Sequence, residues 1–237
     1  MSGWLYGVGV GPGDPELLTL KALRIVEAAP VIAHFAKAGR PSHARAVVAG
    51  RIRPGTVELS LPYPVTTEID RDHGDYRSAI TAFFDQSAAR VAAHLDAGRD
   101  VAVLSEGDPF FYGSYLHLHV RLADRYPAEV VPGVTGMSAC WSLGGEPLVS
   151  GDEVLAVLPS TLPEAELAVR LQRGDGAVLM KLGRNLPKVR RALAEAGRLD
   201  RAIYVERGTM PGSRVVRLAD KSDDEAPYFA VVLVPCR

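Results

Sequence analysis

The stretch GWLYGVGVGPGDPELLTLKAL, residues 3–23, contains the signals that decide the fold. Its apolar run Leu5–Val10 is typical of a buried strand, and Pro15–Ala28 has the spacing of a helix. Between them, Asp14 can accept hydrogen bonds from free amides, and Pro15 is tolerated at the first position of a helix. The stretch therefore predicts a strand that passes through a glycine-rich turn directly into a helix.

The same alternation of strands and helices continues along the chain. The other strands expected in the first half are Val31–Phe35, Val57–Leu61, Val101–Leu104 and Val130–Val131, with a helix over Ala79–Ala97. Those expected in the second half are Val154–Leu158, Ala177–Leu182, Ile203–Glu206, Arg214–Leu218 and Tyr228–Val234, with helices over Glu164–Gln172 and Leu186–Ala196. Such alternation favours an α/β fold with a mostly parallel sheet and helices on its faces.

The second half ends differently from the first. Its last two strands are joined by the acidic segment Asp220–Glu225 without a helix, which predicts a hairpin and hence a mixed sheet. Because the alternation starts again after Pro132 and Gly133, we expect two α/β domains, residues 1–132 and 133–237.

Composition narrows the class of protein. The 237 residues carry a formal net charge of -1, so no overall field attracts nucleic acid or an anionic membrane. Cys140 and Cys236 form no CxxC pair, and no apolar run is long enough to span a bilayer. We expect a cytoplasmic protein with no protein-bound metal, no nucleic-acid partner and no membrane segment.

The glycine-rich turn does not match a phosphate-binding loop. In the two registers of a GxGxxG pattern, starting at Gly7 or Gly9, the third glycine is replaced by Pro12 or Asp14. Pro12 removes a backbone donor, and Asp14 places a carboxylate where an anion would bind. The turn favours close approach of a flat or cationic ligand, or a tight turn without any ligand.

Two further strand ends resemble this turn. VLSEGDPFFYGS, residues 103–114, contains Gly-Asp-Pro and three aromatic residues, and VVPGVTG, residues 130–136, ends another strand. Because the carboxyl ends of parallel strands share one edge, these turns predict a common ligand-binding rim. The polar segment Ser60–Tyr76 is either a binding loop or a plain surface connection.

These runs together resemble the tetrapyrrole methylases. The motifs that carry the resemblance are GVGVGPGDPELLTLKAL (Gly7–Leu23), EGDPFFYGS (Glu106–Ser114), VVPGVTGMS (Val130–Ser138), VLMKLGRN (Val178–Asn185) and YVERGTMPGSRVV (Tyr204–Val216). They occur in order along essentially the whole chain. The resemblance implies two α/β domains with the active site in the cleft between them, and S-adenosylmethionine as methyl donor.

Within the family, three runs look like those of enzymes that methylate precorrin-2. They are YPVTTE (Tyr63–Glu68), EGDPFFYGSY (Glu106–Tyr115) and MKLGRNLPKVRR (Met180–Arg191). The resemblance implies methyl transfer to C20 of precorrin-2, giving precorrin-3A and S-adenosylhomocysteine in cobalamin synthesis, by a homodimer. The alternatives are the cobalt-bearing analogue, another ring carbon, and a carrier without catalytic activity.

The resemblance also implies cofactor contacts at matching positions. These are Pro12, Glu106, Gly107, Asp108, Phe111, Thr135, Gly136, Met180, Gly208, Pro227 and Tyr228. Related sequences often have Gln at the position of Ser213 and vary around Thr135 and Gly136, which weakens the contacts assigned near Gly208 and Gly136.

The substrate is rich in carboxylates, so cations should face it. Lys37 and Arg40, with Tyr112, are the substrate-binding residues expected here, whereas the basic run at residues 188–191 favours a solvated helix face. Asp108, Tyr112, Tyr115 and His117 lie near the rim where a base would remove the C20 proton, but each has a competing role. No catalytic residue is assigned from the sequence.

Overall fold

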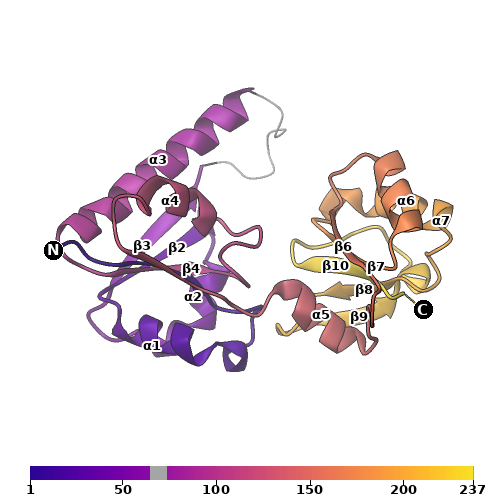
Figure 1. Cartoon of the computed structure of the whole chain (residues 1–237), viewed down its shortest axis with the longest axis horizontal. Helices are drawn as coiled ribbons and strands as arrows, with labels where there is room; N and C mark the ends of the chain where they lie inside the picture. Colours follow the sequence, from indigo (N-terminus) through magenta and orange to yellow (C-terminus); the bar gives the residue numbers. More distant parts are fainter. Residues whose placement is uncertain (65–73, 237) are drawn as a thin grey trace. The chain divides into compact units, whose positions relative to one another are not determined.

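The computed structural model describes residues 1–64 and 74–236, with side chains from residue 77 in the second range. The chain forms two compact units, Met1–Thr135 and Gly136–Arg237 (Figure 1). Residues 133–135, which the sequence analysis placed in the second domain, group with the first unit. Residues 65–73, which include most of the YPVTTE motif and of the segment Ser60–Tyr76, lie outside the described residues.

The first unit is built on a parallel sheet, as the alternation of strands and helices predicts. Its strands are β1 (Leu5–Gly9), β2 (Val31–Lys37), β3 (Val57–Tyr63), β4 (Val101–Ser105) and β5 (Ala128–Val131). They lie in the order β3-β2-β4-β1-β5, and every neighbouring pair is parallel. The carboxyl ends of all five strands therefore lie at one edge of the sheet.

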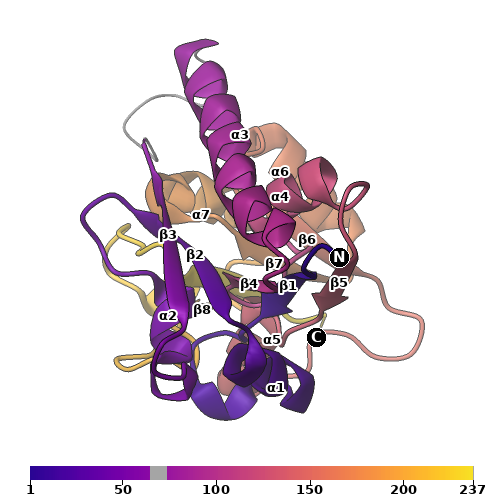
Figure 2. The ribbon, with the colours of Figure 1, turned by 90° about the vertical axis from the view of Figure 1, so that its left-hand side faces the viewer.

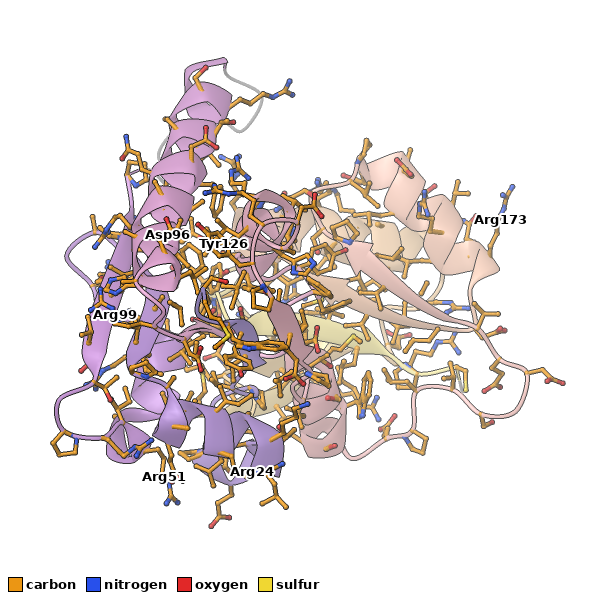
Figure 3. The ribbon with its side chains drawn as sticks, turned by 60° about the vertical axis from the view of Figure 1, so that its left-hand side comes forward. Arg24, Arg51, Asp96, Arg99, Tyr126 and Arg173 are labelled. Carbon is orange, nitrogen blue, oxygen red and sulfur yellow. The ribbon has the colours of Figure 1, made fainter. Side chains whose placement is uncertain are left out.

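Helices cover both faces of this sheet (Figure 2). The helices are α1 (Leu20–Ala28), α2 (His43–Val47), α3 (Gly74–Asp96) and α4 (Tyr115–Leu122), with short 3-10 helices η1 (Pro15–Leu17) and η2 (Ala49–Arg51). Side chains of α1 and α2 form one apolar core with the sheet, and those of α3 and α4 form another. At the end of α3, Asp96 accepts a hydrogen bond of 2.7 Å from the Tyr126 hydroxyl, just before β5 (Figure 3).

The helix expected over Pro15–Ala28 is interrupted. Asp14 accepts a hydrogen bond from the Glu16 amide at 2.9 Å, but it caps only η1. The α-helix starts at Leu20, because Thr19 adopts an extended backbone and its hydroxyl accepts the Ala22 amide at 3.1 Å. The expectation of one continuous helix was wrong, since a second capping residue lies inside it.

The second unit has a mixed sheet, also as expected. Its strands are β6 (Leu155–Pro159), β7 (Gly176–Met180), β8 (Ile203–Glu206), β9 (Arg214–Arg217) and β10 (Ala230–Val234), in the order β6-β7-β10-β8-β9. The expected hairpin of the last two strands was wrong, because β8 lies between them and pairs antiparallel with both. The residues that join β9 to β10 therefore cross β8 instead of turning back beside it.

Helices also cover both faces of the second sheet. They are α5 (Gly136–Gly144), α6 (Glu164–Arg173) and α7 (Leu186–Glu195), with 3-10 helices η3 (Gly183–Asn185) and η4 (Leu218–Asp220). Leucines of α6 and α7 pack on one face of the sheet, and Cys140 of α5 packs on the other. Each unit thus has its own apolar cores.

Candidate functional site

In the first unit, the residues singled out from the sequence lie at the carboxyl edge of the parallel sheet. Lys37 ends β2, Glu106 follows β4, and Pro12 lies in the turn after β1. Gly107, Asp108 and Phe111 continue the turn after β4, and Thr135 lies in the segment after β5. We call this edge the first rim.

The turns of the first rim pack backbone against backbone. Gly11 and Gly107 form an antiparallel bridge, in which the Gly107 amide donates to the Gly11 carbonyl at 2.8 Å. A Cβ atom at Gly9 would lie 2.6 Å from the Gly107 carbonyl oxygen and 2.6 Å from the Gly133 nitrogen. Position 9 therefore requires glycine because the neighbouring turns approach it closely, and no ligand is needed to explain this requirement.

Two carboxylates take part in this packing. The Asp108 side chain accepts hydrogen bonds from the Phe110 amide at 2.9 Å and the Gly133 amide at 3.2 Å. It therefore links the turn after β4 to the turn after β5. Glu106 accepts from the Ala44 amide of α2 at 3.2 Å. Glu106 is exposed as a residue, but desolvation of its carboxyl group beside α2 raises the pKa of that group.

The side chains considered as bases differ in their surroundings. Tyr115 is fully buried, its hydroxyl lies 3.2 Å from His119 Nδ1, and burial raises its pKa far above the ordinary value. His117 stacks on Phe84 with ring centroids 4.0 Å apart, and desolvation lowers its pKa. Tyr115 is therefore unsuited to remove a proton, whereas Tyr112 is 49% exposed at the rim.

In the second unit, four predicted residues also gather at one edge. Met180 ends β7, and Gly208 follows β8. Because β10 runs antiparallel to both strands, its amino end lies at the same edge, preceded by Pro227 and Tyr228. Tyr228 is 84% exposed. We call this edge the second rim.

The backbone of the second rim adopts strained conformations. Lys181, Arg207 and Thr209 have positive φ angles of 59°, 50° and 64°, in the turns that follow β7 and β8. Such angles are uncommon for these residue types and cluster at functional sites. They single out the same two turns as the sequence motifs.

Gly208 lies against α5. A Cβ atom there would lie 2.6 Å from the Cys140 sulfur, and the Gly208 amide donates a hydrogen bond to that sulfur. Burial raises the pKa of the Cys140 thiol to about 11. The thiol is therefore neutral near pH 7 and acts as a packing and accepting group.

Three buried hydroxyls were missed by the sequence analysis. Ser105, Ser160 and Thr209 each have a buried hydroxyl oxygen without a hydrogen-bond partner among the described residues. Ser105 ends β4 at the first rim, whereas Ser160 follows β6 and Thr209 follows β8 at the second. The available signal was a small polar residue at or shortly after the end of a buried strand. A buried polar group without a partner is costly unless a ligand or water completes it.

The basic run at residues 188–191 is not a plain solvated face. Arg190 has a side chain only 19% exposed and donates to the backbone carbonyl of Leu218 at 2.7 Å. Arg191 pairs with Glu164 of α6. Exposed cations near the rims include Lys37 at the end of β2, Arg40 after it, Lys181 and Arg184 after β7, and Arg207 after β8.

A hollow in the first unit lies away from these residues. It is lined by Arg24, Glu27, Ala28, Gly50, Arg51, Ile52, Arg53 and Pro54, at the amino ends of β2 and β3, and Figure 3 labels Arg24 and Arg51 there.

Within the described part of the chain, no group of His, Cys, Asp or Glu residues could hold a metal ion. No helix found in residues 1–64 and 74–236 is both long and apolar enough to cross a membrane.

The sequence pattern of the family Tetrapyrrole (Corrin/Porphyrin) Methylases matches residues 4–220. A Sinorhizobium protein named Precorrin-2 C(20)-methyltransferase is 65% identical over 233 residues, which are 98% of this chain and 95% of that protein. A Salmonella typhimurium protein named Cobalt-precorrin-2 C(20)-methyltransferase is 32% identical over 239 residues, covering 99% of this chain and 97% of the relative.

A solved structure has the same fold. It is uroporphyrin-III C-methyl transferase from Thermus thermophilus, complexed with S-adenyl homocysteine. Its TM-score with this chain is 0.69 at 26% sequence identity, covering 99% of this chain and 98% of that structure.

Proposed function

Because the chain belongs to the tetrapyrrole methylase family, we propose that it transfers a methyl group from S-adenosylmethionine to C20 of precorrin-2. The products are precorrin-3A and S-adenosylhomocysteine, in cobalamin biosynthesis. The observation that carries the proposal is the 65% identity, over 98% of the chain, to a Sinorhizobium protein named for this reaction. Enzymes with the cobalt-bearing substrate are more distant, as the 32% identity of the Salmonella typhimurium relative indicates.

The chemical groups at the two rims fit this cofactor. S-adenosylmethionine offers an ammonium, a carboxylate, ribose hydroxyls and an adenine ring, and the unpartnered hydroxyls of Ser105, Ser160 and Thr209 are suited to bind such groups. The contacts proposed in the second unit are Gly136, Met180, Gly208, Pro227 and Tyr228. Those proposed in the first unit are Pro12, Glu106, Gly107, Asp108, Phe111 and Thr135.

The cofactor supplies a sulfonium methyl group, and the protein's contribution is mainly orientation. Asp108 keeps the turns after β4 and β5 in register through its two hydrogen bonds, so its proposed role combines rim geometry with cofactor contact. The strained turns after β7 and β8 present backbone groups at fixed positions. No side chain is assigned as the base that receives the C20 proton.

The cationic residues of the first rim are proposed to bind the substrate carboxylates. Lys37 and Arg40 are exposed after β2, and Tyr112 is exposed after β4. Charge reversal by Arg40→Glu is expected to raise KM for the tetrapyrrole while leaving the affinity for S-adenosylhomocysteine unchanged. KM is measured by steady-state kinetics and the affinity by calorimetry. An equal weakening of tetrapyrrole binding and of S-adenosylhomocysteine binding would overturn this assignment. A homodimer is a further proposal from the family resemblance, and a cytoplasmic location is one from the composition and cysteine usage.

The proposal is tested by turnover with two substrates. The full chain is mixed with S-adenosylmethionine and either metal-free precorrin-2 or its cobalt complex, and S-adenosylhomocysteine is measured over time. We expect a higher kcat/KM for the metal-free substrate. Preference for the cobalt complex would transfer the assignment to that substrate, and binding of the tetrapyrrole without any turnover would indicate a carrier.

A further inference from the structure

The segment that joins β9 to β10, residues 218–229, has to be held in place without strand partners. We call it the strap. It begins with η4, crosses β8, and ends with Pro227 and Tyr228 at the second rim. Backbone hydrogen bonds hold its two ends, from the Leu218 amide to the Ala202 carbonyl and from the Arg207 amide to the Phe229 carbonyl, and side chains bind carbonyl oxygens between them.

Arg190 of α7 binds the strap along much of its length. Its guanidinium donates to the carbonyl oxygens of Leu218 at 2.7 Å, Lys221 at 2.5 Å and Asp223 at 3.2 Å. Its Nε atom lies 2.7 Å from a carboxylate oxygen of Asp224. One side chain thus fixes the path of the strap at several successive positions.

Lys221 fixes the strap from inside. Its side chain is only 1% exposed, which is rare for lysine and costly unless the charge is paired. The ammonium pairs with the Asp223 carboxylate, donates to the Asp223 carbonyl at 3.1 Å, and lies 5.0 Å from the centre of the Tyr204 ring. The buried charge is therefore surrounded by the strap on one side and by β8 on the other.

The contacts continue from Lys221 to the turn after β8. Tyr204 is fully buried in β8, and its hydroxyl donates to Glu206 Oε2 at 2.7 Å. Glu206 is the last residue of β8 and directly precedes the strained turn at residues 207–209. Lys221, Tyr204 and Glu206 thus connect the strap with the turn that contains Gly208.

We propose that Lys221 is a positioning residue for the cofactor. By holding the strap against Tyr204, it sets the placement of Pro227 and Tyr228 relative to Gly208. This inference rests on the proposed function, because those three residues are proposed cofactor contacts. Because the Asp223 side chain is 47% exposed, an apolar side chain at position 221 leaves no buried charge behind, so the effect on binding can be separated from an effect on folding.

The test is the Lys221→Met variant of the full chain. The dissociation constant of S-adenosylhomocysteine is measured by calorimetry, and amide exchange is followed by mass spectrometry. We expect binding to weaken about tenfold, with faster exchange in residues 206–210 and 221–229. At saturating S-adenosylmethionine kcat should change little, whereas KM for S-adenosylmethionine should rise.

Two further variants make the outcome decisive. Leu171→Val, in the same core, should lower the melting temperature and leave the dissociation constant unchanged. Asp223→Asn removes the exposed carboxylate that pairs with Lys221 and leaves the buried ammonium without it, so it should weaken binding in the same direction.

Three results would contradict the inference. The first is a folded Lys221→Met chain that binds S-adenosylhomocysteine with the wild-type dissociation constant. The second is Asp223→Asn binding as tightly as the wild-type chain. The third is Leu171→Val weakening this binding as much as Lys221→Met does. Failure of the wild-type chain to bind S-adenosylhomocysteine would overturn the proposed function itself, and is recognised by the wild-type measurement alone.

Discussion

Single residues at the first rim are constrained by their neighbours, and Gly9 is the clearest case. Its missing side chain allows the backbones of Gly107 and Gly133 to approach, since a Cβ atom would lie 2.6 Å from atoms of both. Gly9→Ala is therefore expected to lower the free energy of unfolding by about 1–3 kcal/mol, measured by urea denaturation.

The matched control for Gly9 is Gly50→Ala. Nothing lies within 4 Å of a Cβ atom at Gly50, so we expect a change within about 0.5 kcal/mol. Equal losses in the two variants would show that the close packing of the turns does not constrain Gly9.

Cys140 provides a prediction about pH. Burial raises the pKa of its thiol from 9.0 to about 11, so the folded chain holds this proton more tightly than the unfolded chain. The resulting stability is fully present below about pH 9 and is lost as the pH rises through about 11. In Cys140→Ala, the loss of unfolding free energy over this interval should be smaller by about 2 kcal/mol.

The measurement is urea denaturation at several values between pH 8 and 11, with Cys236→Ala as the control. Cys236 is more exposed than Cys140, so this control should follow the wild-type dependence on pH. If Cys140→Ala loses as much unfolding free energy between pH 8 and 11 as the wild-type chain, the buried thiol does not contribute to the pH dependence.

At the scale of elements, α7 places two adjacent arginines in different roles. Arg190 donates to three carbonyls of the strap with a side chain 19% exposed, whereas the Arg191 side chain is 60% exposed and pairs with Glu164. Arg190→Gln should lower the free energy of unfolding by about 2 kcal/mol, because it leaves carbonyls without charged donors. Arg191→Gln should have a clearly smaller effect, since exposed ion pairs contribute little. The reverse order in thermal and urea unfolding would contradict the role given to Arg190.

The sequence predicted elements well wherever a local pattern determines them. The expected strands of both sheets were found with boundaries that differ by a few residues, because most of them are buried and form continuous apolar segments. The first helix was wrong at its start, because Thr19 caps the chain a second time. The hairpin of β9 and β10 was wrong, because β8 lies between these strands and pairs with both, and the local sequence does not indicate that pairing.

The candidate site shows the same limit. The glycine and proline turns predicted that Gly107 lies at a strand end on a common rim, whereas Met180 and Gly208 were expected only from the family resemblance. The hydroxyl of Ser160 and the buried charge of Lys221 were missed, because their burial results from packing between elements distant in sequence.

At the scale of the whole molecule, each unit has separate apolar cores. The cores of the first unit contain residues between Leu5 and Val131, and those of the second contain residues between Met137 and Val234. Gly9→Ala is therefore expected to accelerate amide exchange within residues 1–135 and to leave residues 136–237 unchanged, as followed by mass spectrometry. Uniform acceleration along the chain would instead indicate that both units unfold together.

The function proposed for the whole chain depends on which ring carbon receives the methyl group. The most direct measurement uses S-adenosylmethionine with a ¹³C-labelled methyl group and metal-free precorrin-2, followed by mass and NMR analysis of the tetrapyrrole. We predict a product with one labelled methyl group, attached to C20, and an equal amount of S-adenosylhomocysteine. A label at any other ring carbon, or an unlabelled tetrapyrrole, would contradict the proposed reaction.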